Sequence, residues 1–192
     1  MSADTHIVIL AAGSSSRLGS PKQLIDWHGQ PLLRHLAEQA FDTGLPVTII
    51  LGANSEAIRA TIDELPARII DNPQWSEGMS SSIRLAANGI DAHSLLLMTC
   101  DQPHVSTAVL RALIDAYASG PHPIVASEYG DTVGVPALFD LSLFDELRSL
   151  SGAQGAKSII LRHLTDTLRV SFPEGALDID TPDDVARLRS GH

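Results

Sequence analysis

Two positively charged side chains, Arg17 and Lys22, lie in a loop of small residues that follows an apolar run, His6-Ile-Val-Ile-Leu-Ala-Ala12. Gly13 and Gly19 let the loop backbone adopt left-handed conformations and approach a ligand closely. Backbone N–H groups in such a loop can form an anion-binding concavity, to which Arg and Lys add charge and directional donors. The pattern indicates a phosphate-binding loop after a buried strand, although the spacing alone also fits an ordinary turn.

The loop matches neither of the two common glycine-rich phosphate motifs. No Gly-Lys-Ser/Thr follows it, as a Walker A motif requires. Ser15 occupies the position of the second glycine of Gly-x-Gly-x-x-Gly, so the dinucleotide-binding fingerprint is also incomplete.

Two aspartates, Asp101 and Asp180, are candidates for ligand contact. Asp101 directly follows the apolar run 95–100, and such a position lies at the carboxyl edge of a sheet, where open α/β folds bind ligands. Asp180 precedes Thr181-Pro-Asp-Asp184, which is typical of a helix start with Thr as the N-cap and Pro at the first helical position. Each aspartate is therefore either a ligand-binding carboxylate or a residue that caps a helix or forms a turn.

A third candidate segment, Asn72-Pro-Gln-Trp-Ser-Glu-Gly-Met-Ser-Ser-Ser-Ile83, contains one glycine and a run of serines. Gly78 leaves space for a planar base to approach the backbone. The serines at 80–82 either hydrogen-bond the edge of a base or cap the following helix. Trp75 is interpreted as a packing residue and not as a platform on which a base stacks.

Other reactive residue types give little indication of chemistry. The eight histidines include no His-x-x-x-His or His-x-Cys pairing, so a zinc site is not indicated. There is no Gly-x-Ser-x-Gly elbow. Cys100 is the only cysteine, so the chain forms no internal disulfide, which fits a reducing cytoplasm. We expect this cysteine to pack beneath Asp101.

Alternating strands and helices are predicted to position these residues. Strand-like apolar runs span 7–12, 47–51, 67–71, 94–99 and 124–127, and helical spacing spans 32–43, 55–65, 80–88 and 105–118. After Gly130 the predicted pieces are shorter: an edge segment at 137–138, helices at 141–150 and 156–164, and a strand at 168–171. This order predicts right-handed βαβ units, a mostly parallel sheet and a single domain over 1–192.

The composition limits the class of protein. With 192 residues, 44% of them hydrophobic and 19% charged, the chain is expected to form a folded domain with a sizeable core. A net charge of −10 argues against binding to nucleic acid or to an anionic membrane. No apolar run approaches the roughly 20 residues of a membrane span. No secretory signal is visible, so we expect a cytoplasmic protein.

The complete strings resemble the motifs of the MobA-like NTP transferase family, most closely those of its molybdenum cofactor cytidylyltransferase branch. The family opening, Leu-Ala-Ala-Gly-x-Ser-x-Arg-x-Gly-x-x-Lys-x-Leu, is matched at every fixed position between Leu10 and Leu24. Cys100-Asp-Gln-Pro103 is similar to the family's metal-binding motif, and Asp178-Ile-Asp-Thr-Pro-Asp-Asp184 is similar to its Asp-Ile-Asp-Thr-Pro-Glu-Asp element. The segment 72–83 resembles Asn-Pro-x-Trp-x-x-Gly-Met-x-x-Ser-Leu/Ile, and the likeness extends from residue 7 to residue 188.

Two weaker likenesses fall in an acceptor-side subregion, roughly 130–180. Gly134-Val-Pro136 occupies the place of the family's Gly-x-Pro turn, whose other reading is an ordinary turn. Gly152-Ala-Gln-Gly-Ala-Lys157 aligns with Gly-Asp-x-Gly-Ala-Arg/Lys, but Ala153 stands where an Asp is usual. Lys157 keeps the positive charge and is expected to meet an acceptor phosphate.

The resemblance implies a Rossmann-like nucleotidyltransferase fold, an α/β three-layer sandwich with a mostly parallel sheet. It also implies transfer of a nucleotidyl group from an NTP to an acceptor phosphate, with release of pyrophosphate. Arg17 and Lys22 are then catalytic: Arg17 holds the β- and γ-phosphates with the amides of 12–16, and Lys22 stabilises charge at the α-phosphate. Asp101 and Asp180 are the implied ligands of Mg²⁺. The implied nucleotide-binding residues are Leu10, Ala11, Ala12, Gly13, Ser14, Ser15, Gly78 and Ser82.

CTP and a molybdopterin-type molybdenum cofactor are the implied substrates, and a molybdoenzyme or its chaperone is the implied protein partner. A guanylyltransferase and a transferase acting on a sugar or alditol phosphate are alternatives within the enzymes. Ala153 keeps open a further alternative, a non-catalytic chaperone that binds the molybdenum cofactor.

Overall fold

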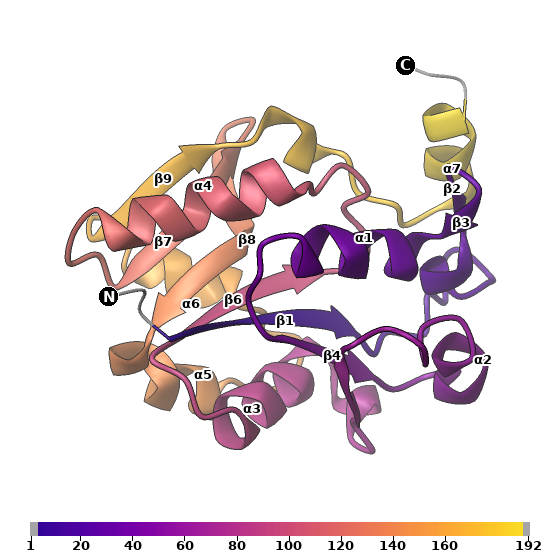
Figure 1. The fold of residues 1–192 in the computed structure, drawn as a ribbon, viewed down its shortest axis with the longest axis horizontal. Coiled ribbons are helices and arrows are strands. Elements are labelled where there is room, and N and C mark those ends of the chain that lie inside the picture. The colour runs from indigo at the N-terminus through magenta and orange to yellow at the C-terminus, as the bar shows by residue number, and fades with distance from the viewer. Residues whose placement is uncertain (1–3, 190–192) are drawn as a thin grey trace.

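The computed structural model describes residues 4–189, in which seven strands form one sheet in the order β5-β4-β1-β6-β8-β7-β9 (Figure 1). Strand β8 pairs antiparallel with β6 and β7, and the other neighbouring strands of this sheet are parallel. The strands are β1 (Thr5–Ala11), β4 (Val47–Leu51), β5 (Arg68–Asp71), β6 (Ser94–Thr99), β7 (Ile124–Tyr129), β8 (Thr132–Asp140) and β9 (Thr167–Ser171). A small hairpin of β2 (Asp26–Trp27) and β3 (Gln30–Pro31) lies outside the sheet and was not predicted.

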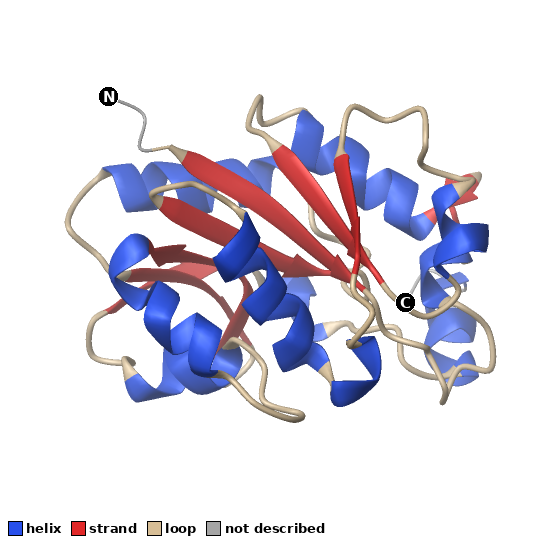
Figure 2. Ribbon diagram, turned by 90° about the horizontal axis from the view of Figure 1, so that it is seen from below, coloured by secondary structure: helices blue, strands red, loops and turns tan. Residues whose placement is uncertain are grey.

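Helices cover both faces of the sheet and give three layers (Figures 1 and 2). One hydrophobic cluster joins α1 (Leu32–Phe41) and α4 (Thr107–Ala118) to one face, and a second joins α3 (Met79–Gly89), α5 (Phe144–Ser149) and α6 (Lys157–Arg162) to the other. Because side chains alternate along a strand, Ile7 and Ile9 of β1 pack in the first cluster, while Val8 and Leu10 pack in the second. The predicted α/β class and mostly parallel sheet are confirmed.

Two helix starts follow from local sequence. The Ser106 side chain accepts a hydrogen bond from the Val109 amide and caps α4. At α7 (Pro182–Arg189), the Thr181 hydroxyl accepts from the Asp184 amide at 3.3 Å, and the Asp184 carboxylate accepts from the Thr181 amide at 2.8 Å. This is a capping box with Asp in place of the usual Glu or Gln, and it confirms the predicted helix start.

Two predicted elements differ from the structure. The segment 137–138 is not an edge strand, because it belongs to the nine-residue β8 between β6 and β7, where hydrophobic side chains are buried on both faces. The predicted helix 55–65 contains only α2 (Ser55–Arg59). Beyond it, the amides of Ile62 and Leu65 bond to carbonyls three residues earlier, which gives tight turns instead of a continuing α-helix.

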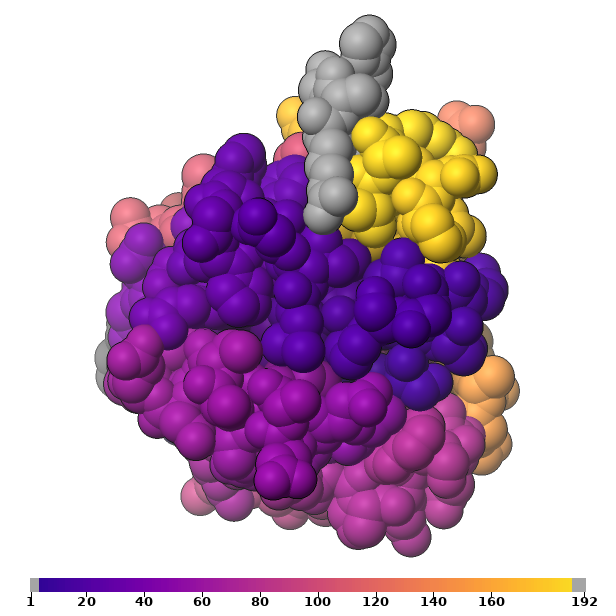
Figure 3. Space-filling model, turned by 90° about the vertical axis from the view of Figure 1, so that its right-hand side faces the viewer, coloured from indigo at the N-terminus to yellow at the C-terminus, as the bar shows by residue number. Residues whose placement is uncertain are grey.

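The carboxyl ends of β1, β4 and β6 meet at one edge of the molecule. Figure 3 looks onto this side and shows the yellow C-terminal segment against the indigo N-terminal segment. Arg17 and Asp180, 163 residues apart in sequence, are in direct contact there. Within residues 4–189, no helix combines the length and apolarity that crossing a bilayer requires.

Candidate active site

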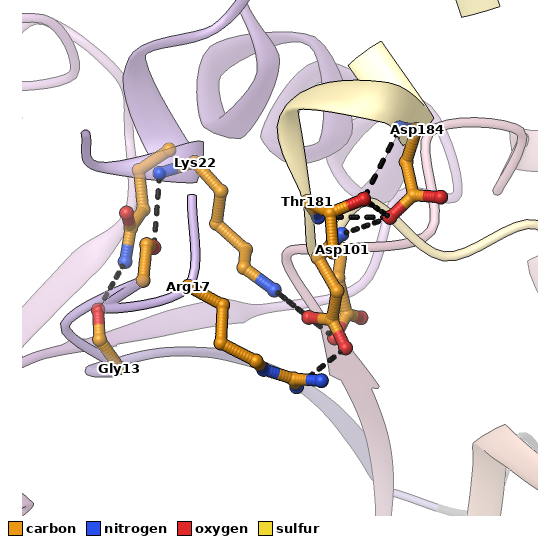
Figure 4. Close-up of polar contacts among 9 residues, drawn as sticks. Gly13, Arg17, Lys22, Asp101, Thr181 and Asp184 are labelled. Carbon is orange, nitrogen blue, oxygen red and sulfur yellow. Dashed lines mark hydrogen bonds and ion pairs between the residues drawn. The ribbon is translucent and has the colours of Figure 1, made fainter. Parts of the chain in front are cut away.

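Four of the predicted site residues converge at this edge (Figure 4). Lys22 Nζ lies 2.7 Å from Asp180 Oδ1 and 3.6 Å from Asp101 Oδ2. Arg17 Nη2 lies 2.7 Å from Asp180 Oδ2, so Asp180 receives one cation on each carboxylate oxygen. The side chain of Lys22 is 15% exposed and that of Arg17 is 71% exposed. The structure therefore has a mostly buried lysine and a mostly exposed arginine, and both contact Asp180.

Separate parts of the fold deliver these four side chains. Arg17 lies in the loop after β1, and Lys22 begins a short 3₁₀ helix, Lys22–Leu24. Asp101 follows β6, as predicted. Asp180 is held by two backbone features: the Ile179 amide donates to the Asp101 carbonyl at 2.8 Å, and the capping box of α7 begins at the next residue. The helix-start reading and the ligand reading of Asp180 are thus compatible, because Thr181 caps the helix and leaves the Asp180 carboxylate free for other contacts.

The charged side chains of this cluster shift one another's pKa values. Hydrogen bonding from Lys22 lowers the pKa of Asp180, and Arg17 acts in the same direction. Burial by itself lowers the pKa of Lys22, but Asp101 and Asp180 outweigh it and raise that pKa above its usual value. A third aspartate, Asp178, was not predicted as a site residue. Lost hydration raises the pKa of Asp178 to about 6, and the negative charges of Asp101 and Asp180 contribute to the rise.

The donor set fits a magnesium ion that arrives with a nucleotide. Asp101 and Asp180 offer hard carboxylate oxygens beside one ammonium group. Burial is the largest cause of the raised pKa of Asp178, and the negative charges of Asp101 and Asp180 add to it. Among residues 4–189, no three His, Cys, Asp or Glu side chains are arranged to hold a metal by themselves. Mg²⁺ commonly takes one or two carboxylates and completes its shell with water and substrate phosphates. Asp101 and Asp180 match that requirement.

A pocket of about 320 Å³ lies between the first residues of the loop after β1 and the start of α3. Six of the eight predicted nucleotide-binding residues line it: Leu10, Ala12, Gly13, Ser14, Gly78 and Ser82. Ala11 does not, because its side chain packs in the core on the opposite face of the sheet. Ser15 does not line it either, and its hydroxyl accepts a hydrogen bond from the Lys22 amide at 3.0 Å. Trp75, Ser76 and Met79 complete the wall without having been predicted to do so.

The serines of α3 do not cap their helix. The Ser80 hydroxyl donates to the Gly152 carbonyl at 2.6 Å, and the Ser81 hydroxyl donates to the Gly78 carbonyl at 2.8 Å. Asn72, a buried residue just after β5, donates from its side-chain amide to the hydroxyls of Ser81 and Ser82, at 2.8 and 3.0 Å. Asn72 therefore fixes Ser82 at the pocket wall, and the hydrogen of the Ser82 hydroxyl remains to be donated.

Gly78 has a different reason for being glycine than the one predicted. Its φ is +107°, and a Cβ there would lie 2.7 Å from the Gly152 carbonyl oxygen. The loop that includes Gly152 and Ala153 thus fills the space on the Cβ side of Gly78, while the residue also lines the pocket. Gly155 faces Met79 in the same contact. The predicted nucleotide segment and the predicted acceptor-side loop are therefore packed directly against each other.

Of the remaining acceptor-side residues, Gly134 and Pro136 lie within a strand, and Lys157 lies where its charge acts on Asp178. Gly134 and Pro136 lie inside β8, so the predicted turn is wrong; a register shift in the β7–β8 pairing occurs at this level. The Tyr129 hydroxyl occupies the space that a Gly134 side chain would need. Lys157 is exposed at the start of α6, where its charge acts on Asp178. Cys100 is buried beside Asp101 as expected, and burial raises the pKa of its thiol, so it is no nucleophile.

Comparisons with known proteins agree with this architecture. Residues 7–167 match the MobA-like NTP transferase domain. A nicotine blue oxidoreductase of Paenarthrobacter nicotinovorans is 33% identical over 94% of both chains. A molybdenum cofactor guanylyltransferase of Xanthomonas euvesicatoria is 28% identical over 94% of this chain and 92% of the relative. The molybdenum cofactor cytidylyltransferase of Escherichia coli is 22% identical over 92% and 91%.

A solved structure with the same fold is that of Rv0371c from Mycobacterium tuberculosis in complex with manganese. It superposes with a TM-score of 0.81 at 28% identity, and the match covers 98% of this chain and 100% of that one. The family match spans most of the chain, and it includes the loop after β1 and Asp101. The chain therefore belongs to the MobA-like NTP transferase family.

Proposed function

We propose that this protein transfers CMP from CTP to the phosphate of a molybdopterin-type molybdenum cofactor and releases pyrophosphate. The observation that carries the proposal is that one loop, after β1, contributes to two features: its first residues line a pocket with Gly78 and Ser82, and its Arg17 meets Asp180, which also contacts Lys22. Two cations and two carboxylates, including Asp101, suit a metal-bound triphosphate whose nucleoside occupies that pocket. A molybdoenzyme or its chaperone is the protein partner that such a product requires.

The reaction needs positioning and charge neutralisation more than covalent help from the protein. An oxygen of the acceptor phosphate attacks the α-phosphorus of CTP, and the bond to the pyrophosphate oxygen breaks. A phosphate monoester is already ionised near neutral pH, so no general base is required. Arg17, which is mostly exposed, is placed to leave Asp180 and bind the β- and γ-phosphates. Lys22, sheltered between Asp101 and Asp180, is placed to stabilise the charge that develops around the α-phosphate.

Asp101 and Asp180 are the residues that would hold Mg²⁺, which would neutralise the charge of the phosphates. The manganese complex of a relative with this fold supports the assignment. With Lys22 and Arg17 moved onto phosphate, the Asp180 carboxylate would lose both of its present partners, and its negative charge would be left uncompensated and open to a cation. In this proposal, Arg17, Lys22 and Asp180 have two alternative sets of contacts: with one another, or with phosphate and metal.

Two features of the pocket support CTP as the donor. Ser82, fixed by Asn72, presents a small hydroxyl donor, and the loop 152–155 behind Gly78 closes the wall. These suit a compact pyrimidine better than a purine. The same loop leads to Lys157 at the start of α6, which places a positive charge on the acceptor side. Ala153, where the family usually has Asp, lies in this loop beside Gly78.

Two other activities are favoured by sequence identity. The guanylyltransferase relative is 28% identical and the cytidylyltransferase relative 22% identical, which supports GTP as the alternative donor. The 33% identical nicotine blue oxidoreductase supports an oxidoreductase reaction as a second candidate. Such a reaction transfers electrons and releases no pyrophosphate, so the two classes separate when NADH and NADPH serve as redox probes beside the pyrophosphate assay.

The test is pyrophosphate release by the purified protein with each of the four NTPs and Mg²⁺, with and without molybdenum cofactor. NADH and NADPH oxidation is followed in parallel by absorbance. We expect pyrophosphate only when CTP and the cofactor are both present. Release with GTP in place of CTP would change the donor and keep the reaction. Nicotinamide oxidation without pyrophosphate would refute the proposed function.

A further inference from the structure

Gln23 is buried beneath the loop after β1 and contacts that loop at two points. Its side-chain amide donates to the Ala11 carbonyl at 2.7 Å and to the Gly13 carbonyl at 3.1 Å (Figure 4 shows the second bond). The residue is 1% exposed. Among the described residues, its Oε1 has no hydrogen-bond partner. An apolar side chain of the same length would avoid burying an unpaired acceptor, so packing alone does not explain a glutamine here.

The bond to the Gly13 carbonyl bears on the direction of the Ser14 amide, and a separate bond from Ala53 bears on that of the Gly13 amide. The peptides that follow Ala12 and Gly13 are trans, so each N–H points away from the preceding carbonyl. The Gly13 carbonyl faces Gln23, and the Ala12 carbonyl accepts from the Ala53 amide at 3.0 Å. The Ser14 N–H therefore points away from Gln23 and the Gly13 N–H away from Ala53, and both residues line the pocket. Within residues 4–189, neither of these two amides donates a hydrogen bond.

Gln23 also connects this loop to Lys22. The two residues are adjacent in the 3₁₀ helix 22–24, and the Lys22 amide donates to the Ser15 hydroxyl at 3.0 Å. Ser15 has a φ of +55°, and its carbonyl accepts from the amides of Leu18 and Gly19. The backbone of the loop and the base of the Lys22 side chain are thus held by one small set of bonds. Gln23 is the member of that set that is most deeply buried.

We propose that Gln23 is a positioning residue of the donor site, which aims the Ser14 amide at the nucleotide phosphates and keeps the loop in register with Lys22. The inference rests on the proposed function, because it assumes that a nucleotide occupies the pocket beside the loop. The family motif treats position 23 as variable, and the residue itself does not line the pocket. Its effect on the nucleotide is therefore transmitted through the backbone of residues 11–14.

The first test replaces Gln23 with Met, which keeps the length and removes the donor. CTP binding in the presence of Mg²⁺ is measured by calorimetry, and the Gly13 and Ser14 amide signals are followed by ¹⁵N NMR. We expect a Kd about tenfold higher, the size of effect that the loss of one well-placed hydrogen bond gives. We also expect a smaller CTP-induced shift of the Ser14 amide signal. In turnover, the KM for CTP rises while the KM for the acceptor does not.

Gln39→Met is the matched control. Gln39 Oε1 accepts from the Thr107 amide at 3.0 Å and joins α1 to α4, away from the loop. This variant loses an internal glutamine hydrogen bond too, so it is expected to lower the melting temperature and leave the CTP Kd unchanged. A folded Gln23→Met protein with wild-type CTP affinity and wild-type amide shifts would overturn the proposal. Absence of nucleotide binding by the wild type would overturn the proposed function as well.

Gln23→Glu tests the same point where Gln23→Met does not fold. A protonated Glu has the shape of Gln and can donate one hydrogen bond, whereas the ionised form cannot donate and repels the two carbonyls. Burial raises the pKa of such a carboxyl, so the protonated form is accessible in mildly acidic buffer. Relative to wild type at each pH, CTP affinity of this variant should fall as pH rises. A profile parallel to that of the wild type would contradict the positioning role.

Discussion

Lys22→Met removes the one ammonium group that lies between Asp101 and Asp180 and keeps the length of the side chain. In the structure this group lies 2.7 Å from one carboxylate and 3.6 Å from the other, and its side chain is 15% exposed. The substitution therefore has two separable consequences. It removes a charged donor from the reacting phosphate, and it leaves Asp101, Asp178 and Asp180 with Arg17 as the remaining cation of the predicted set.

The two consequences differ in size, and only the loss of stability should be reversed by added Mg²⁺. Loss of a donor aimed at developing charge typically lowers kcat by 10²–10³, about 2.7–4 kcal/mol in the barrier, and added metal does not restore it. Loss of a hydrogen bond to a charged group lowers the free energy of unfolding by about 1.5–3 kcal/mol. That second loss should be reduced by Mg²⁺, because the cation replaces the missing positive charge. Lys22 also lowers the pKa of Asp178, so in the variant Asp178 should titrate above its present value of about 6.

The assay combines pyrophosphate release at saturating CTP with melting curves at increasing Mg²⁺. Carboxyl NMR of Asp178 gives the titration directly. Arg111→Met is the control, since Arg111 is an exposed cation that bonds to the Asp42 carbonyl far from the site. We expect the control to retain wild-type kcat. The reasoning is refuted if Lys22→Met raises the KM for CTP and leaves kcat unchanged, or if Mg²⁺ stabilises the variant no more than the wild type.

Four further predictions concern the same edge of the sheet. Asp101→Ala should abolish turnover with the fold intact by circular dichroism, because a metal ligand is lost; near-normal turnover at saturating Mg²⁺ would refute the assignment. Arg17→Ala should weaken CTP binding about tenfold with little change in kcat, measured by calorimetry and initial rates, since this exposed arginine binds ground-state phosphates. The pKa of Asp178 is raised from 3.8 to about 6, so the folded state binds more protons than the unfolded state in that window, and the free energy of unfolding should fall as pH rises from about 4 to about 6. Asp178→Asn should flatten that part of the pH profile in urea titrations, and an unchanged profile would contradict the pKa assignment. Competition between equimolar CTP and GTP should favour CTP by at least about tenfold, or about 1.4 kcal/mol, and Ser82→Ala should reduce the preference if its hydroxyl contacts the base.

The sequence was informative where chemistry follows directly after a buried strand. The apolar runs at 47–51 and 94–99 are strands with those bounds, and the loop after β1 and Asp101 lie at the carboxyl ends of parallel strands, as the alternation of elements requires. Parallel strands bring their carboxyl ends to one edge, so the meeting of these two segments could be inferred without coordinates. The Thr181 capping signal was equally local, since all its partners lie within four residues.

What the sequence did not reveal depends on contacts between distant segments. The contact of the loop 152–155 with Gly78 has no local signature, because a glycine at a positive φ looks the same whatever fills the space beside it. Of the strand 132–140, only 137–138 was predicted, as an edge segment, because Gly134 and Pro136 interrupt an apolar pattern that continues through the strand. Asp178 and Gln23 were passed over for a related reason. The importance of Asp178 comes from groups as distant in sequence as Asp101 and Lys22. That of Gln23 comes from backbone carbonyls, which carry no residue-type signal.

The pairing of Asp180 with Arg17 and Lys22 bears on how the site works as a whole. The two cations that the proposed mechanism gives to phosphate are, without nucleotide, the partners of a carboxylate that the mechanism gives to metal. A triphosphate that draws these cations away leaves Asp180 uncompensated beside Asp101, and a divalent cation then restores neutrality. In this mechanism, binding of the triphosphate therefore favours binding of the divalent cation. Thermodynamic linkage requires the cation to favour triphosphate binding by the same factor. In the proposed mechanism, the two ion pairs of Asp180 would therefore be exchanged for contacts with the triphosphate and the cation.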